Sequence, residues 1–161
     1  MNIFLTGATG FIGKYTARRL LAAGHTVRAL ARDPSRLDGL LALGVEPAPG
    51  SLEDLSALRA GMRGCDAVIH LAGQYAMWHP HPQTFWRANV DGTRNVMQAA
   101  LECGASKVVH MSTVAVWGKP ARTPFDEDTP PGPRMLSEYA RSKAAGEQVA
   151  WSFVRQHGLP L

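Results

Sequence analysis

Short apolar runs alternate along this chain with longer segments of helical periodicity, and this alternation restricts the possible folds strongly. The runs that we predict as strands are residues 2–6, 26–31, 45–48, 66–71 and 107–112. The segments that we predict as helices are residues 11–23, 34–43, 52–60, 83–103 and 134–156. Apolar strands separated by helices are typical of a parallel sheet covered on both faces. The sequence therefore predicts a doubly wound α/β fold of three layers.

A glycine-rich turn separates the first predicted strand from the first predicted helix. Its glycines are Gly7, Gly10 and Gly13. Gly7 permits a tight turn, Gly10 lets the backbone approach a pyrophosphate, and Gly13 lets the helix pack closely on the strand. The amino terminus of the helix adds N–H groups and a positive dipole end. In this position the turn predicts a Rossmann-type dinucleotide site rather than a merely flexible loop.

The residue after the second predicted strand bears on the choice of dinucleotide. An acid there would bind the adenosine ribose and repel a 2′-phosphate. This chain instead has Arg32, followed by Asp33, Ser35 and Arg36. A guanidinium can form paired, charge-assisted hydrogen bonds with a phosphate. Arg32 favours NADP as the cofactor, with NAD as the alternative, unless it is only a solvated surface charge. We interpret Asp33 as the start of the next helix.

A tyrosine, a lysine and a threonine could carry proton transfer. Tyr139 and Lys143 share one face of the predicted helix 134–156, about 6 Å apart along its axis. The ammonium favours a phenolate, so this tyrosine could pass a proton to or from a hydroxyl or carbonyl oxygen. Thr113, at the end of the fifth predicted strand, offers a hydroxyl to orient that oxygen. An ordinary helix pair is the alternative interpretation of Tyr139 and Lys143.

Three further segments complete a familiar pattern: residues 70–73 (HLAG), residues 89–93 (NVDGT), and residues 112–113 taken with 139–143 (YARSK). With the glycine turn they resemble the extended short-chain dehydrogenase/reductase family, the NAD(P)-dependent epimerase/dehydratase group. The resemblance covers nearly the whole chain. A narrower resemblance, to hopanoid-associated sugar epimerases and dihydroflavonol-reductase-like proteins, rests on the single loop 74–82.

The resemblance implies roles for individual residues. Tyr139 would be the general acid/base, Lys143 would also hold the nicotinamide ribose, and Thr113 would orient the substrate, with Ser112 as the weaker candidate. The cofactor would be contacted by residues of the glycine turn, the strand ends and the last helix: Gly7, Gly10, Phe11, Ile12, Gly13, Arg32, Leu52, Leu71, Ala72, Gly73, Tyr139 and Lys143.

The implied activity is an NAD(P)-dependent oxidoreductase or epimerase. Hydride would pass between the nicotinamide and a carbonyl or hydroxyl substrate, either a nucleotide-sugar or a small ketone. The alternative is a non-catalytic NADP-binding or redox-sensing module.

The chain departs from the family pattern at a few positions. Ser51 stands where the family often has an adenine-contacting Asp, and Trp117 replaces a tyrosine. We interpret Asn89 as structural, tying its helix to neighbouring strands. Four apolar side chains either line a substrate pocket or cover the core: Met77, Trp78, Phe85 and Trp86.

Composition restricts the partners. Lys and Arg number 17 against 13 Asp and Glu, a formal charge of +4, and they are scattered rather than clustered. This pattern predicts no nucleic-acid binding and favours phosphate-bearing small molecules. Cys65 and Cys103 stand alone, so we expect a reducing, cytoplasmic environment. The sequence shows no signal-peptide pattern and no membrane-length apolar run. His79 and His81 lack further ligands nearby, so no metal is predicted.

Length agrees with one domain over residues 1–161, an NAD(P)-binding Rossmann domain. Members of the resembled family usually continue for about the same length again, into a sixth strand and a substrate lobe. We therefore expect residues 158–161 to be the start of that strand in a longer protein, a minimal nucleotide-binding half being the alternative. The resemblance also implies a homodimer through helices 83–103 and 134–156.

Overall fold

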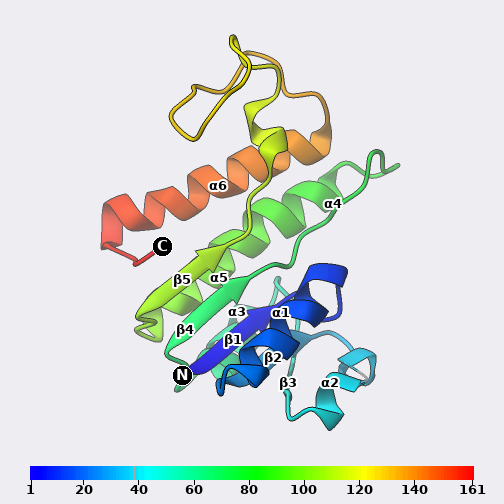
Figure 1. Ribbon diagram of the computed structural model, residues 1–161, viewed down its shortest axis with the longest axis vertical. Helices are drawn as coiled ribbons and strands as arrows, with labels where there is room; N and C mark the ends of the chain where they lie inside the picture. Colours follow the sequence, from blue (N-terminus) through cyan, green and yellow to red (C-terminus); the bar gives the residue numbers. More distant parts are fainter. Residues whose placement is uncertain (38) are drawn as a thin grey trace.

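The computed structural model describes residues 1–37 and 39–161. Its strands are β1 (Asn2–Thr6), β2 (Thr26–Ala31), β3 (Glu46–Pro49), β4 (Ala67–His70) and β5 (Lys107–His110). They form one parallel sheet in the order β3-β2-β1-β4-β5 (Figure 1). The predicted doubly wound α/β fold is confirmed.

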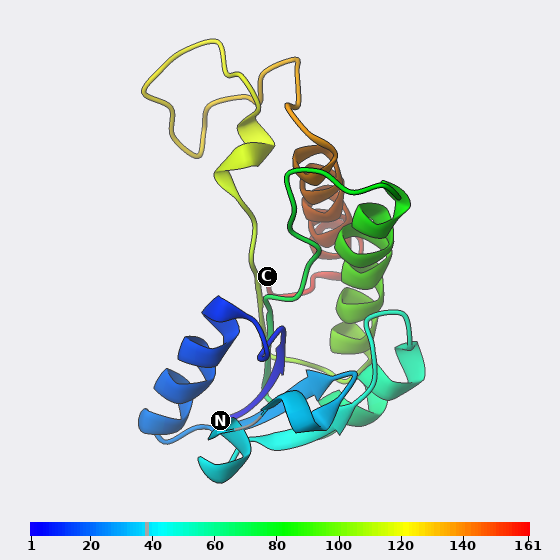
Figure 2. The same ribbon diagram turned by 90° about the vertical axis from the view of Figure 1, so that its right-hand side faces the viewer.

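Helices cover both faces of this sheet (Figure 2). They are α1 (Phe11–Ala22), η1 (Pro34–Leu37), α2 (Gly39–Ala42), α3 (Leu55–Met62), α4 (Gln83–Trp86), η2 (Arg87–Asp91), α5 (Gly92–Glu102), η3 (Val114–Trp117) and α6 (Glu138–His157). The core that contains Phe4 and Val68 packs against α3, α5 and α6, whereas the core that contains Leu5 and Val27 packs against α1 and α2. Successive strand residues thus enter opposite cores, which explains why Ile3, Phe4 and Leu5 of the central strand β1 are all apolar.

Three helices differ from their predicted bounds. The helix expected at 83–103 contains a π-helical turn, η2, between α4 and α5. The helix expected from residue 134 begins at Glu138, because the Ser137 side chain caps it by accepting a hydrogen bond from the Ala140 N–H at 3.1 Å. The helix expected at 34–43 is present as η1 and α2, and residue 38 between them lies outside the described residues. Other elements differ only at their ends.

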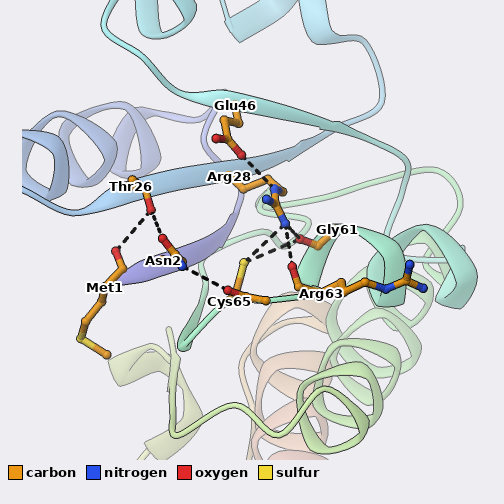
Figure 3. A network of polar contacts seen from close by, with 9 residues as sticks. Met1, Asn2, Thr26, Arg28, Glu46, Gly61, Arg63 and Cys65 are labelled. Atoms are coloured by element: carbon orange, nitrogen blue, oxygen red, sulfur yellow. Dashed lines mark hydrogen bonds and ion pairs between the residues drawn. The ribbon is translucent and has the colours of Figure 1, made fainter.

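A polar network near the amino ends of the strands fastens α3 to the sheet (Figure 3). Arg28 of β2 donates to the Glu46 carboxylate at 3.1 Å and to the backbone carbonyls of Gly61 and Arg63 at 2.9 and 3.0 Å. These carbonyls lie at the carboxyl end of α3, where a cation is favourable. Arg28 therefore has a structural role, and it lies in the first half of β2, away from the glycine turn.

The last residues of the chain run beside β5. The backbone N–H of Val108 donates to the carbonyl of Pro160 at 2.7 Å, and Leu159 is buried in the core. The segment that we expected to start a sixth strand therefore lies at the β5 edge. Among the described residues, no helix combines the length and apolarity needed to cross a membrane.

Candidate cofactor groove and catalytic helix

A groove of about 310 Å³ opens at the carboxyl ends of β1, β2 and β4. The strand order reverses between β1 and β4, and parallel sheets of this kind bind ligands at such a reversal. The groove is lined by Gly7, Thr9, Gly10, Leu30, Ala31, Arg32, Gly50, Ser51, Leu52, Glu53, Leu71, Ala72, Gly73, Gln74 and Ala88. The fold thus gathers five separate segments of the chain around one hollow.

The glycine turn forms one wall of this groove. Gly7 has a φ of 80°, and a Cβ there would lie 2.7 Å from the Ala72 nitrogen. A Cβ on Gly13 would lie 2.0 Å from the Gly7 carbonyl oxygen, so only glycine lets α1 pack against the turn. Helix α1 begins at Phe11, directly after Gly10, and presents unpaired backbone N–H groups there. This bare, N–H-rich turn suits a dinucleotide pyrophosphate.

The predicted cofactor residues divide into two groups. Seven of them line the groove: Gly7, Gly10, Arg32, Leu52, Leu71, Ala72 and Gly73. Five do not: Phe11 and Ile12 are exposed, Gly13 is buried where α1 packs against the glycine turn, and Tyr139 and Lys143 lie on α6. The groove is also lined by residues that were not predicted from the sequence: Thr9, Leu30, Ala31, Gly50, Glu53, Gln74 and Ala88. Several of these adjoin predicted residues, whereas Ala88 has no motif that could have identified it.

Arg32 lines the groove, whereas its acidic neighbour is engaged elsewhere. The Asp33 carboxylate accepts hydrogen bonds from the Ser35 hydroxyl at 2.7 Å and the Ser35 backbone N–H at 3.0 Å. These bonds lower the pKa of Asp33. Asp33 thus opens the η1 turn, as the sequence indicated, and of these two charged neighbours only Arg32 lines the groove.

A chain of buried hydrogen bonds begins beneath the groove. The Ala72 N–H donates to the Thr6 hydroxyl oxygen at 3.1 Å, and that hydroxyl lies 2.7 Å from His70 Nδ1. His70 Nε2 lies 3.2 Å from the Thr93 hydroxyl, which donates to the Asn89 carbonyl at 2.8 Å. All these groups are satisfied when Thr6 donates to Nδ1 and a neutral His70 carries its proton on Nε2.

Asn89 extends this chain of bonds to α6. Its amide donates to the Gln74 carbonyl at 3.1 Å and to the Ser142 hydroxyl at 2.9 Å, and its side-chain oxygen accepts from the Gln74 N–H at 2.8 Å. Ser142 in turn donates to the Tyr139 carbonyl at 2.9 Å. Asn89 therefore joins the groove loop to the helix that carries Tyr139 and Lys143, a structural role of the kind expected from the sequence.

An Asn89→Ala variant should be less stable by about 2 kcal/mol, because one buried and two half-buried hydrogen bonds are lost. Urea denaturation measures this free energy of unfolding. Asn95→Ala is the matched control: its amide makes one bond, to the Leu52 carbonyl at 2.9 Å in a half-buried position, and its loss should cost about 1 kcal/mol or less. Equal losses in the two variants would argue against a central role for Asn89.

The three predicted catalytic residues lie on α6 and at the exit of β5. Lys143 is 7% exposed, and its ammonium donates to the Met111 carbonyl at 2.6 Å. Thr113 caps η3, where its hydroxyl oxygen accepts from the Ala115 N–H at 3.3 Å. Tyr139 lies one turn before Lys143, and the ring of Tyr75 meets it edge-to-face with centroids 5.0 Å apart. Lys143 thus bonds to the strand exit two residues before Thr113.

Two histidines lie beneath Lys143. The rings of His70 and His110 are 5.2 Å apart. Burial, then the charges of His110 and Lys143, hold the pKa of His70 well below its usual range. Burial, followed by the charge of Lys143, lowers the pKa of His110 to about 4. Burial also lowers the pKa of Lys143 itself, and the Glu147 carboxylate opposes that shift.

Acidification from pH 6.5 towards pH 4 should therefore destabilise the fold. The unfolded chain binds more protons than the folded chain in this window, because both histidines have lowered pKa values when folded. Each should lower the free energy of unfolding by about 1.4 kcal/mol per pH unit. Urea denaturation across this range measures the slope. His110→Leu should make the slope shallower, and an unchanged slope would contradict this assignment.

The apolar residues of the loop after β4 and of α4 have different surroundings. Phe85 is buried in the interior, whereas Met77 and Trp78 are 84% and 77% exposed. The Trp86 indole donates to the Glu138 carboxylate at 3.1 Å. The core interpretation therefore applies to Phe85 alone.

Trp117 donates to the Thr129 carbonyl at 2.8 Å and so fastens the loop that follows η3.

The histidines of the loop 74–82 also make local contacts. His79 Nδ1 accepts a hydrogen bond from the His81 backbone N–H at 3.0 Å. Within residues 1–37 and 39–161, no three His, Cys, Asp or Glu side chains gather closely enough to hold a metal ion.

Both the sequence and the fold of the chain are similar to those of known proteins. The sequence matches the NAD dependent epimerase/dehydratase family over residues 3–161. It is 35% identical to a putative dihydroflavonol 4-reductase of Synechocystis sp., over 95% of this chain and 45% of the relative. The chain spans about half the length of such curated relatives.

Two solved structures share the fold. A short-chain dehydrogenase/reductase superfamily protein from Agrobacterium tumefaciens with bound NAD has a TM-score of 0.85 and 31% identity, over 99% of this chain and 47% of that one. A dTDP-glucose 4,6-dehydratase from Streptomyces venezuelae with NAD bound has a TM-score of 0.87 and 31% identity, over 99% and 53%.

Proposed function

The chain belongs to the NAD dependent epimerase/dehydratase family, and on that premise we propose that it is the cofactor-binding part of an NADP-dependent oxidoreductase or epimerase. The observation that carries the proposal is the groove at the β1–β4 reversal, which combines the bare glycine turn with Arg32 and the exits of the strands. The substrate would be a carbonyl or hydroxyl compound, either a nucleotide-sugar or a small ketone. Relatives include both a named reductase and a named sugar-nucleotide dehydratase.

The groove would hold the dinucleotide along its length. Backbone N–H groups from Gly7 to the start of α1 would bind the pyrophosphate, Leu52 would contact the adenine side, and Leu71 to Gly73 would flank the nicotinamide side. Bound there, the cofactor supplies hydride transfer. Lys143 would reach the nicotinamide ribose from α6.

Proton transfer would fall to Tyr139, with Thr113 orienting the same substrate oxygen. The Thr113 oxygen accepts a backbone hydrogen bond, which leaves its own proton available for donation. The Ser112 hydroxyl instead donates to Glu147. This difference supports Thr113 over Ser112 as the substrate-orienting hydroxyl. In reduction Tyr139 would give a proton to the carbonyl oxygen, and in oxidation it would take one from the hydroxyl.

NADP is the cofactor that the end of β2 favours. Arg32 lines the groove, whereas Asp33 is occupied by Ser35. The two solved relatives hold NAD, which lacks the 2′-phosphate. The preference for NADP is therefore proposed for this chain from its own residues. Glu53 also lines the groove, and its negative charge would repel a phosphate placed close to it. The attraction of Arg32 for the 2′-phosphate would have to exceed this repulsion.

An Arg32→Ala variant should bind NADPH about 10- to 100-fold more weakly, because it loses charge-assisted hydrogen bonds to the 2′-phosphate. Its affinity for NADH should change by about twofold or less. Calorimetric titration of the purified chain with each cofactor measures both. Arg36→Ala, which removes a nearby exposed charge outside the groove, should leave both affinities unaltered. Tighter binding of NADH than NADPH by the unaltered chain would overturn the NADP assignment alone.

A further inference from the structure

Helix α6 contacts the exit of β5 through two side chains, one helical turn apart. The Lys143 ammonium donates to the Met111 carbonyl at 2.6 Å. The Ser112 hydroxyl donates to the carboxylate of Glu147. Met111 and Ser112 are consecutive, and Thr113 follows them. The helix thus holds the two residues that precede the proposed substrate-orienting threonine.

The same two side chains carry opposite charges, and they lie four residues apart on one face of α6. Lys143 is 7% exposed, and Glu147 is half-buried. The groups that face Lys143 from the sheet are His110 of β5 and His70 of β4, both neutral because burial holds their pKa values low. On α6 itself the neighbours are Tyr139 and Glu147. The negative charge of Glu147 is therefore what favours the ammonium form of Lys143 against burial.

We propose that Glu147 is a positioning residue of the site, which keeps Lys143 charged and, through Ser112, fixes the strand exit that carries Thr113. The inference rests on the proposed function of Tyr139 and Lys143. Glu147 would contact neither substrate nor cofactor, and it would act through Lys143 and Ser112.

Two substitutions separate the charge of Glu147 from its contact. Glu147→Gln removes the charge but retains a side-chain carbonyl that can accept the Ser112 hydroxyl. Ser112→Ala removes the contact but retains the carboxylate. Glu147→Asp retains the charge on a shorter side chain. If the charge matters, Lys143 should respond to the first substitution and much less to the other two.

The test is an NMR titration of the chain labelled with ¹³C at the lysine ε-carbon, which reports ionisation of the amine. The lysines stand at positions 14, 107, 119 and 143, so the spectrum is simple, and Lys143→Arg assigns the signal. Glu147→Gln should lower the titration midpoint of Lys143 by about one pH unit or more, a tenfold gain in neutral amine at a fixed pH. Ser112→Ala and Glu147→Asp should shift it by a few tenths.

An unchanged midpoint in Glu147→Gln overturns the proposal. An equal shift in Ser112→Ala also overturns it, because the contact rather than the charge would then explain the effect. NADPH affinity is measured separately on the unaltered chain. If that binding is absent while Lys143 still responds to Glu147→Gln, the proposed function fails and the charge coupling stands.

Discussion

Replacing Tyr139 by phenylalanine should lower the turnover number of the intact protein by a factor of about 10²–10⁴, the usual contribution of a general acid or base. The substitution keeps the ring that packs edge-to-face against Tyr75 and removes only the hydroxyl. The fold and cofactor affinity should therefore remain nearly unchanged. Turnover is followed by the absorbance of NADPH with a carbonyl substrate.

The control for this variant is Tyr15→Phe, which removes a hydroxyl from an exposed tyrosine on α1. Its turnover should match that of the unaltered protein. If Tyr139→Phe also retains full turnover, Tyr139 is not the acid/base group. A chain that binds NADPH under those circumstances would act as a nucleotide-binding module.

A Gly13→Ala variant should lose at least about 3 kcal/mol of stability, because the added methyl meets backbone that cannot move aside. The new Cβ would lie 2.0 Å from the Gly7 carbonyl oxygen and 2.7 Å from the Ala8 Cα. Relief of this overlap requires α1 to move away from the turn, which also removes the proposed pyrophosphate site. Urea denaturation measures the loss of stability.

Gly39→Ala provides the matched control for this substitution. Gly39 begins α2, and, apart from its chain neighbours and its own helix backbone, a Cβ there would meet no heavy atom of the described residues within 4 Å. The same chemical change should therefore be neutral or stabilising by about 0.5–1 kcal/mol. If Gly13→Ala were as stable as Gly39→Ala, the close packing of α1 on the turn would be refuted.

The sequence predicted features whose causes are local or periodic. Strands were expected because the inner strands of a sheet covered on both faces have runs of apolar residues, as Ile3 to Leu5 of β1 show. The glycine turn was expected because the backbone packs so closely at Gly7 and Gly13 that no residue with a Cβ fits there. The turn of Asp33 with Ser35 could be anticipated because its partners lie two residues apart.

Features that depend on distant residues were not predictable in the same way. Asn89 bonds to Gln74 and Ser142, 15 and 53 positions away, and no periodicity encodes such partners. The π-helical turn around Asn89 also lay inside what reads as one continuous amphipathic helix. Lys143 was expected beside Tyr139, yet its contact with the Met111 carbonyl depends on how α6 packs against β5.

The binding of NADPH in the groove can be mapped directly by amide NMR of the ¹⁵N-labelled chain. We expect saturable shifts at the groove residues Gly7, Gly10, Arg32, Ala72 and Gly73. A second hollow, of about 320 Å³, lies where α3 and α5 end and is lined by Arg59, Arg63, Gly64, Glu102 and Cys103. Saturable shifts confined to that hollow, or no saturable shifts at all, would contradict the assignment of the groove as the cofactor site.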